Sequence, residues 1–350
     1  MKLKYTLTWI FLAVLSVQFV LFFLLKKEKV DVLLKRDKIS FEQLRSSTKE
    51  TVFHHVDAYL TDHFPYKNKY IGLSNYLTKG ILGNNNANQK VIWSPSNWLF
   101  YNATLNDDLG INEFYGYHEL SATELDKIKT NVQTIRNWCQ RHSILFEVIL
   151  CPNKHSIYPE KLPPYLRKYV SKSQLSQILQ NDASIIDLRK VLLEKKKTSP
   201  LDLYYPTDTH WNQYGAFLAV KELTKKLAMN YPEIRGFDAK ASRQINHKEM
   251  DLANMLGLNS VLRSSEAHLL FSGLPKQKIP HLVIVHDSFL HAMTPSLEKV
   301  FSKISPKYIF ESGLLSPEIL LKEKADVFVI ELVERYKMSL CGDIHPDFYK

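Results

Sequence analysis

The sequence is short of the residues that define several simple classes of protein. It has 11 glycines in 350 residues, against about 7% in an average protein, which excludes collagen-like and glycine-rich low-complexity chains. Its three cysteines are too few for a disulfide scaffold and lack the paired CxxC spacing of a structural zinc site. No segment repeats at a fixed period. Because apolar residues make up 45% and charged residues 23%, we expect a globular protein.

The formal charge of +10 first suggests a nucleic acid or an anionic membrane as partner. Residues 1–30 contain five lysines and one glutamate, which leaves +6 on residues 31–350, with 41 basic and 35 acidic residues. No basic stripe interleaved with aromatic residues occurs there, so nucleic acid is not an expected partner.

The N-terminal segment is long and apolar. Residues 6–25 are twenty residues without a charge, flanked by lysines on both sides. As a helix they span about 30 Å, the thickness of the hydrocarbon core of a bilayer. A cleaved signal peptide usually has an apolar core of about 7–15 residues and a small-x-small cleavage site. Neither is visible, which favours residues 1–30 as an uncleaved single-pass anchor.

The remaining sequence alternates between strand and helix patterns. Ser121 and Glu124 form a capping box that opens a helix to about Arg141, and a second helical pattern covers residues 212–229. Short apolar runs typical of buried parallel strands lie at residues 144–150, 184–188, 281–285, 307–310 and 325–332. This alternation predicts an α/β sheet covered on both faces. We expect residues 31–90 to form a stem and residues 91–350 one domain, with an insertion around 235–280.

Two segments carry residues suited to nucleophilic catalysis, and we expect both at the carboxyl ends of strands, where α/β sheets bind ligands. One is residues 204–212, with Asp208 and His210. The other is residues 282–289, where a strand runs directly into Asp287 and Ser288. A nucleophilic serine needs a base and a carboxylate that orients the base. Asp208 and His210 would share a face in an extended segment.

Each of these residues also has a simple structural interpretation. A serine after a strand is often a helix N-cap, and a histidine near a helix start is often only hydrogen-bonded there. A metal hydrolase site that uses Asp208, His210, Asp287 and His291 is a further alternative, but the spacing matches no common ligand motif such as HExxH.

The strings themselves resemble the alginate O-acetyltransferase family, the periplasmic SGNH-hydrolase-like proteins of the AlgJ/AlgX type. The resemblance covers roughly residues 55–336, in order. The matching strings are Asp62-His63-Phe64-Pro65-Tyr66-Lys67, Trp98-Leu99-Phe100-Tyr101, Pro152-Asn153-Lys154, Ile157-Tyr158-Pro159-Glu160, Leu162-Pro163, Asp208-Thr209-His210-Trp211-Asn212-Gln213-Tyr214-Gly215-Ala216, Asp251-Leu252-Ala253-Asn254-Met255-Leu256, His286-Asp287-Ser288-Phe289 and Glu331-Leu332-Val333-Glu334-Arg335. Lys67 stands where the family has Arg, and Asn97 stands where Gly is common.

The resemblance implies a three-layer α/β/α fold of the SGNH-hydrolase type with a mainly parallel sheet. By motif, Ser288 would be the nucleophile, His210 the general acid–base and Asp208 its orienting partner. His286 replaces the glycine of the usual Gly-Asp-Ser, so the backbone there lacks the freedom for positive φ. The Ser288 N–H would be one oxyanion donor, and the candidates for the second are Asn153, Tyr101 and Arg335.

The expected activity is acetyl transfer through an acetyl-serine intermediate to hydroxyls of a polysaccharide, without a cofactor or a metal. The resemblance also implies a multi-pass membrane-bound O-acyltransferase that supplies the acetyl group, and a periplasmic or otherwise extracytoplasmic domain anchored in the inner membrane. Two alternatives stay open. One is a polysaccharide or carbohydrate esterase, a deacetylase with the same Ser-His-Asp triad. The other is a non-catalytic carbohydrate-binding subunit of a polysaccharide assembly complex.

Overall fold

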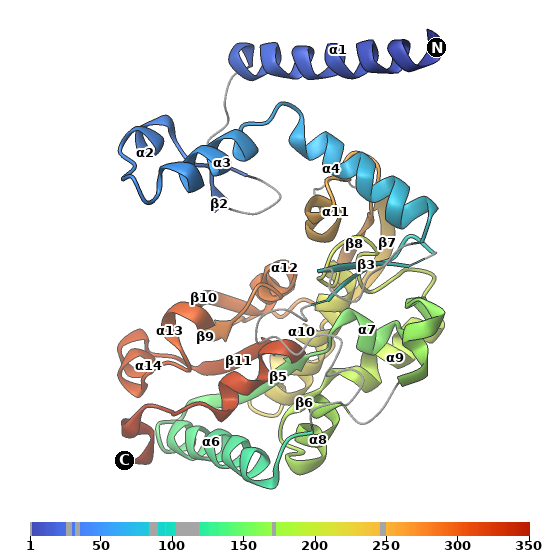
Figure 1. Ribbon diagram of the computed structural model, residues 1–350. Coiled ribbons are helices and arrows are strands. Elements are labelled where there is room, and N and C mark those ends of the chain that lie inside the picture. The colour runs from blue at the N-terminus through green and yellow to red at the C-terminus, as the bar shows by residue number, and fades with distance from the viewer. Residues whose placement is uncertain are drawn as a thin grey trace. The chain divides into compact units, whose positions relative to one another are not determined.

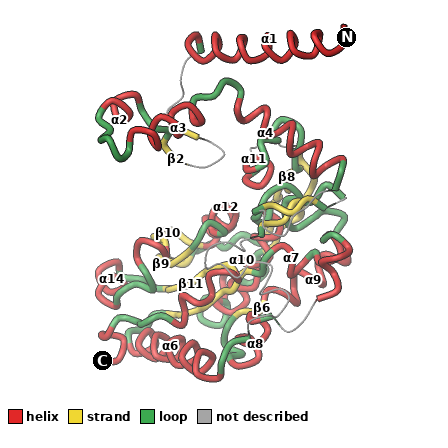
Figure 2. Tube along the Cα trace, in the orientation of Figure 1, coloured by secondary structure: helices red, strands yellow, loops and turns green. Residues whose placement is uncertain are grey.

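The computed structural model describes residues 2–25, 30–31, 36–83, 90–94, 96–102, 119–169, 173–245 and 250–350. The chain divides into two compact units, Met1–Asn84 with Ala253–Leu262, and Asn85–Leu252 with Arg263–Lys350. Figure 1 labels the elements of both units, and Figure 2 colours them by secondary structure.

The first unit is mostly helical. Helix α1 (Lys2–Leu24) includes Tyr5–Leu24, whose mean hydropathy of 2.4 and length would allow it to cross a membrane, and none of this span is buried. The predicted N-terminal apolar helix is therefore present, and a membrane anchor and a signal sequence both fit it. The other elements are β1 (Val30–Asp31), β2 (Arg36–Asp37), α2 (Phe41–Arg45), α3 (Val52–Asp62), α4 (Lys67–Asn75) and the π-helix η1 (Tyr76–Ile81).

The second unit is built on a five-stranded parallel sheet in the order β10-β9-β11-β5-β6. The strands are β5 (Leu145–Cys151), β6 (Ile186–Asp187), β9 (Ile279–His286), β10 (Phe301–Tyr308) and β11 (Val327–Val333). The central strand β11 pairs with β5 on one side and with β9 on the other, and all seven of its residues are buried.

Helices cover both faces of this sheet (Figure 1). Alternate residues of each central strand enter two different cores, so that Leu282 and Ile284 pack on one face of β9 and Val283 and Val285 on the other. The first face is covered by α9 (Leu188–Thr198), α10 (Gln213–Leu227) and α12 (Leu290–Val300), and the second by α6 (Ala122–Arg141), α8 (Gln174–Asn181), α13 (Ile309–Ser312) and α14 (Pro317–Glu323). The predicted three-layer α/β/α architecture is confirmed.

The strand predictions are correct except at the edge of the sheet. Predicted runs 144–150, 184–188, 281–285 and 325–332 overlap β5, β6, β9 and β11. The run predicted at 307–310 covers only the last two residues of β10, which ends at Tyr308, and its second half is wrong because residues 309–312 form α13. As an edge strand, β10 buries only Phe301 and carries exposed polar residues and a proline, so its sequence shows no apolar run.

The remaining elements of the second unit lie outside this sheet. They are the antiparallel pairs β3 (Val91–Trp93) with β4 (Leu99–Tyr101) and β7 (Asp238–Ile245) with β8 (Ser265–Ser272), the helix α7 (Lys154–Ile157), and the 3₁₀ turns η2 (Pro159–Lys161), η3 (Pro164–Tyr169), η4 (Pro232–Ile234), η5 (Glu334–Cys341) and η6 (Pro346–Tyr349). A short helix, α11 (Asp251–Met255), precedes β8. All three cysteines are free thiols.

The helix starts follow their sequence signals. The Ser121–Glu124 capping box opens α6 as predicted. Asn212 caps α10, because its side-chain oxygen accepts hydrogen bonds from the amides of Tyr214 and Gly215. Gly215 is required here, since a Cβ atom would lie 2.3 Å from the carbonyl oxygen of Leu203. The first turn of α10, which follows His210 and Trp211 in the chain, therefore packs closely against the backbone at Leu203.

Candidate active site

Asp208 and His210 lie in a loop that joins Tyr204 to Trp211. These two end residues form an isolated antiparallel bridge, and the Tyr205 amide donates to the His210 carbonyl oxygen at 3.2 Å. The prediction that the pair follows a strand in an extended segment is therefore wrong. The loop instead makes a turn in which Asp208 Oδ1 accepts a hydrogen bond from the His210 backbone amide at 3.0 Å.

The loop brings Asp208, His210 and Ser288 into one chain of hydrogen bonds. Asp208 Oδ1 lies 2.6 Å from His210 Nδ1, and His210 Nε2 lies 2.8 Å from Ser288 Oγ. The carboxylate therefore keeps the proton on Nδ1, and Nε2 is left to accept the proton of the serine hydroxyl. This is the geometry that a base-activated serine requires.

The turn that carries Ser288 continues strand β9. Ser288 is not a helix cap, because α12 is preceded by Phe289 and has no side-chain cap. Instead, Asp287 is buried and its carboxylate accepts the amides of Phe289 at 2.8 Å and Val333 at 2.6 Å. Burial raises the pKa of Asp287, which these hydrogen bonds oppose. No residue from His286 to Phe289 has a positive φ, so this turn forms without a glycine.

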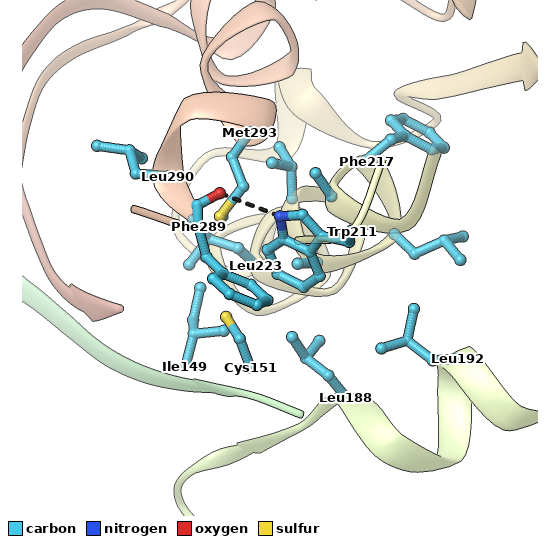
Figure 3. Close-up of a cluster of buried hydrophobic side chains, with 14 of the residues drawn as sticks. Ile149, Cys151, Leu188, Leu192, Trp211, Phe217, Leu223, Phe289, Leu290 and Met293 are labelled. Atoms are coloured by element: carbon cyan, nitrogen blue, oxygen red, sulfur yellow. Dashed lines mark hydrogen bonds between the residues drawn. The ribbon is translucent and has the colours of Figure 1, made fainter. Parts of the chain in front are cut away.

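The buried Trp211 joins the two segments (Figure 3). Its indole Nε1 donates to the carbonyl oxygen of Phe289 at 3.0 Å, and its ring packs against the Phe289 ring at 5.2 Å. The neighbouring His210 ring also lies 5.0 Å from the Phe289 ring. His210 and Trp211 of the loop thus contact Ser288 and Phe289 of the turn, and these contacts fix the distance between the loop and the turn.

Asp251 supports the same loop from outside. Its backbone amide donates to Asp208 Oδ2 at 2.7 Å, and its own carboxylate accepts the Thr209 amide at 2.7 Å and the Thr209 hydroxyl at 2.5 Å. Burial alone would raise the pKa of Asp208, but the hydrogen bonds and charge of His210 and the amide of Asp251 hold it below its usual range. Burial and the charge of Asp208 raise the pKa of Asp251.

A buried lysine lies behind the loop. Lys154 is 4% exposed, and its Nζ donates to the carbonyl oxygens of Tyr205 at 3.0 Å, Pro206 at 3.1 Å and Asp208 at 2.6 Å. Burial lowers the pKa of Lys154, while the charges of Asp208 and Asp251 act in the opposite direction. Three acceptors around one nitrogen match the three N–H bonds of the ammonium form.

Ser288 and His210 open on a cavity of about 290 Å³. Its lining residues are Tyr205, Asp208, His210, Trp211, Gln213, Met250, Glu266, Ser288, His291 and Ala292. Glu266 accepts hydrogen bonds from the Tyr205 hydroxyl and from the amide of Ala267, the latter at 2.9 Å. The cavity is large enough for a small acyl group and part of a sugar ring, and its polar groups can bind hydroxyls.

The three candidates for the second oxyanion donor lie together, but around a different cavity. Tyr101, Asn153 and Arg335 line a space of about 20 Å³ with Phe100, Lys154, His155 and Thr209. The Asn153 side-chain oxygen Oδ1 accepts a hydrogen bond from Arg335 Nη1 at 3.0 Å, and the Asn153 backbone amide donates to the Glu334 carboxylate at 2.8 Å. Ser288 does not line this space, so the role of all three in binding an oxyanion stays a prediction.

The described residues contain a group that could hold a metal ion, formed by Asp208, His210 and Asp251. This group does not include Asp287 and His291, which the metal site considered from the sequence would use. The Asp287 carboxylate instead accepts hydrogen bonds from two backbone amides. The possible ligand atoms are also engaged: Asp208 Oδ1 contacts His210 Nδ1, and Asp251 Oδ2 contacts the Thr209 hydroxyl. The arrangement fits a hydrogen-bonded relay better than a metal centre.

Lys154, Asp251 and Trp211 also contact the Asp208–His210 loop or the Ser288 turn, and the sequence did not predict this. Lys154 and Asp251 are 54 and 43 residues from Asp208 along the chain, so no local spacing links them. A lysine after a strand and an aspartate in the first turn of a short helix are both common surface residues, so neither type indicates a buried role. The one available signal is that all three lie within the quoted family strings.

Residues 91–269, 179 residues of the 350, match the family model described as "SGNH hydrolase-like domain, acetyltransferase AlgX". The chain belongs to this family. The region that matches the AlgX family includes Asp208 and His210 and ends before Ser288, whose position relative to them comes from the geometry above. No curated protein sequence matches the chain.

Several solved structures are similar to part of the chain. The O-acetyltransferase domain of Pseudomonas putida AlgJ is 19% identical over 74% of this chain and 95% of its own length, with a TM-score of 0.46. Pseudomonas aeruginosa AlgX is 19% identical over 71% of this chain and 62% of its own, with a TM-score of 0.47. Bacillus cereus PatB1 is 14% identical over 74% of this chain and 98% of its own, with a TM-score of 0.46. Likenesses of this size carry no information about substrate.

Proposed function

We propose that this protein is a membrane-anchored, extracytoplasmic O-acetyltransferase that moves an acetyl group through acetyl-Ser288 to hydroxyls of a polysaccharide. The observation that carries the proposal is the relay from Asp208 through His210 to Ser288, with contacts of 2.6 and 2.8 Å. This relay lies in a chain of the AlgX family and opens on a cavity.

In the first half-reaction, His210 Nε2 takes the proton from Ser288 Oγ as Oγ attacks the carbonyl carbon of the acetyl donor. The Ser288 N–H makes no hydrogen bond within the described part of the chain and is available to the oxyanion. When the tetrahedral intermediate collapses, the leaving group departs with the proton from Nε2, and acetyl-Ser288 remains.

In the second half-reaction, a sugar hydroxyl gives its proton to His210 Nε2 and attacks the acetyl carbonyl. Collapse breaks the bond to Ser288 Oγ, which takes the proton back from Nε2. Asp208 stabilises the imidazolium in both half-reactions, because its Oδ1 accepts the Nδ1 hydrogen bond throughout. Transfer prevails over hydrolysis when the sugar excludes water from the acetyl-enzyme.

The anchor, the donor and the location belong to the same proposal. The exposed apolar span Tyr5–Leu24 supports a single pass through the inner membrane. An extracytoplasmic active site has no direct access to cytosolic acetyl-CoA. A multi-pass membrane-bound O-acyltransferase that passes acetyl across the membrane would supply it, and the anchor would keep the second unit at the membrane surface.

Incubation of the purified full-length protein with 4-nitrophenyl acetate and a panel of oligosaccharides tests the proposal. Acetylated sugar that forms with wild-type protein and not with Ser288→Ala would support it. Acetate as the sole product, independent of any saccharide, would favour the esterase instead. Sugar acetylation that persists in Ser288→Ala would contradict the mechanism, and saccharide binding without any turnover would favour the non-catalytic subunit.

A further inference from the structure

The Lys154 ammonium contacts three carbonyl groups of the Asp208–His210 loop. We propose that Lys154 is a positioning residue, which sets the Asp208–His210–Ser288 geometry by holding the carbonyl groups of the loop around its ammonium. The inference rests on the proposed function, because only that function makes Asp208, His210 and Ser288 catalytic.

The surroundings of Lys154 are built for a cation. Its Nζ lies 5.2 Å from the centre of the Phe100 ring and 5.6 Å from that of Trp98, and it is 4% exposed. The remaining contacts are the three carbonyl oxygens of Tyr205, Pro206 and Asp208. An ammonium has three donors, which are all used here, and carbonyl dipoles directed at it compensate part of its lost hydration.

These contacts determine the path of the loop. The three carbonyls belong to residues on both sides of Thr207, so a single nitrogen draws the backbone into the turn that ends at His210. The Pro206 carbonyl also accepts the Leu99 amide at 2.8 Å, which ties the turn to β4. Without Lys154, the Tyr205 and Asp208 carbonyls would lose a strong partner while buried, and the loop would relax to satisfy them.

A small relaxation would reach the reacting atoms. Lys154 contacts the carbonyl of Asp208, the residue whose carboxylate orients His210 at 2.6 Å. Displacement of a catalytic group by about 1 Å is sufficient to cost about 100-fold in rate. The ammonium is not expected to contact substrate, because Lys154 lines the smaller cavity and Ser288 the larger one.

The test compares full-length wild type, Lys154→Met, Lys154→Gln and Lys154→Arg. Lys154→Met removes the charge and the donors at similar size, Lys154→Gln keeps two donors, and Lys154→Arg keeps the charge but replaces the compact ammonium with a planar group. Lys161→Met is the matched control, because the Lys161 ammonium also lies over the Trp98 ring, at 5.7 Å, without contacting the loop.

Three readouts are measured: the rate of Ser288 labelling by phenylmethylsulfonyl fluoride, kcat and KM with 4-nitrophenyl acetate across the pH range in which imidazoles titrate, and the proton NMR signal of the His210 Nδ1–H. We expect Lys154→Met to lose about 100-fold in labelling and kcat with a much smaller change in KM, to alter the pH profile, and to lose the downfield proton signal. Lys154→Gln should fall in between, and Lys161→Met should match wild type.

The inference is overturned if folded Lys154→Met labels Ser288 at the wild-type rate, with the wild-type pH profile and proton signal. It is also overturned if the losses in all variants only follow the fraction of unfolded protein measured by circular dichroism. If Lys154→Met does not fold, the Gln and Arg variants decide by the same criteria. A wild-type protein that shows the proton signal but neither labels nor transfers acetyl would refute the proposed function, and the proton signals of the variants would still test the inference.

Discussion

The two segments that meet at the site, the Ser288 turn and the Asp208–His210 loop, are held in place by different means. The Ser288 turn follows β9, an interior strand that pairs with β10 on one side and with β11 on the other. The Asp287 carboxylate then binds two backbone amides, one in the turn itself and one at the end of β11. Backbone pairing thus positions Ser288.

The Asp208–His210 loop has little backbone pairing apart from the bridge at its ends. Side chains from distant parts of the sequence hold it instead: Lys154 binds its carbonyls, Asp251 binds Thr209, and Ser264 binds Thr207 with an oxygen–oxygen distance of 2.7 Å. The comparison shows that one site can join a rigid sheet element to a loop that depends on buried polar contacts. The loop should therefore be the part most sensitive to single polar substitutions.

The largest effect on activity is expected from a substitution that removes the charge of Asp208 and leaves the shape of the loop unchanged. Asp208→Asn keeps the size of the side chain but cannot hold the proton on His210 Nδ1 in the same way. We expect kcat for 4-nitrophenyl acetate to fall by about 10³-fold or more, as in other Ser-His-Asp sites, with the thermal unfolding midpoint close to that of wild type. A kcat within tenfold of wild type would contradict the orienting role.

A substitution in the turn should affect stability instead. Asp287→Ala leaves the buried amides of Phe289 and Val333 without acceptors, and we expect the free energy of unfolding to fall by about 2–5 kcal/mol in urea titrations. Asp343→Ala is the control, because this exposed carboxylate pairs with Lys127 at 2.9 Å on the surface, and its loss should cause no measurable change. Equal stabilities for the two variants would refute the account of the turn.

The smallest effect concerns acid sensitivity beside the loop. Burial, Arg335 and Lys154 lower the pKa of His155 from 6.5 to about 3. Between these two values the unfolded chain binds more protons than the folded chain, so this residue makes stability fall as the pH decreases through that window. His155→Gln should flatten the dependence of the unfolding free energy on pH in that window. An unaltered slope in His155→Gln would contradict the lowered pKa.

The same comparison explains how much the sequence could predict. Apolar runs revealed β5, β9 and β11, and β9 runs directly into Asp287 and Ser288 as predicted. The pairing of Asp208 with His210 was also found, although through an incorrect assumption of extended backbone. The supports of the loop could not be predicted, because Lys154 and Asp251 lie 54 and 43 residues from Asp208 and each contacts the loop through a few hydrogen bonds. Such contacts leave no periodic pattern.

The central claim is that Ser288 carries the acetyl group, and trapping that intermediate tests it most directly. Purified full-length protein is incubated with 4-nitrophenyl acetate, quenched with acid, digested and examined by mass spectrometry. We predict an acetyl group on the peptide that contains Ser288, absent from Ser288→Ala and lost when an accepted oligosaccharide becomes acetylated. Acetylation of the sugar that proceeds in Ser288→Ala, or that proceeds in wild type while Ser288 is never acetylated, would contradict the account.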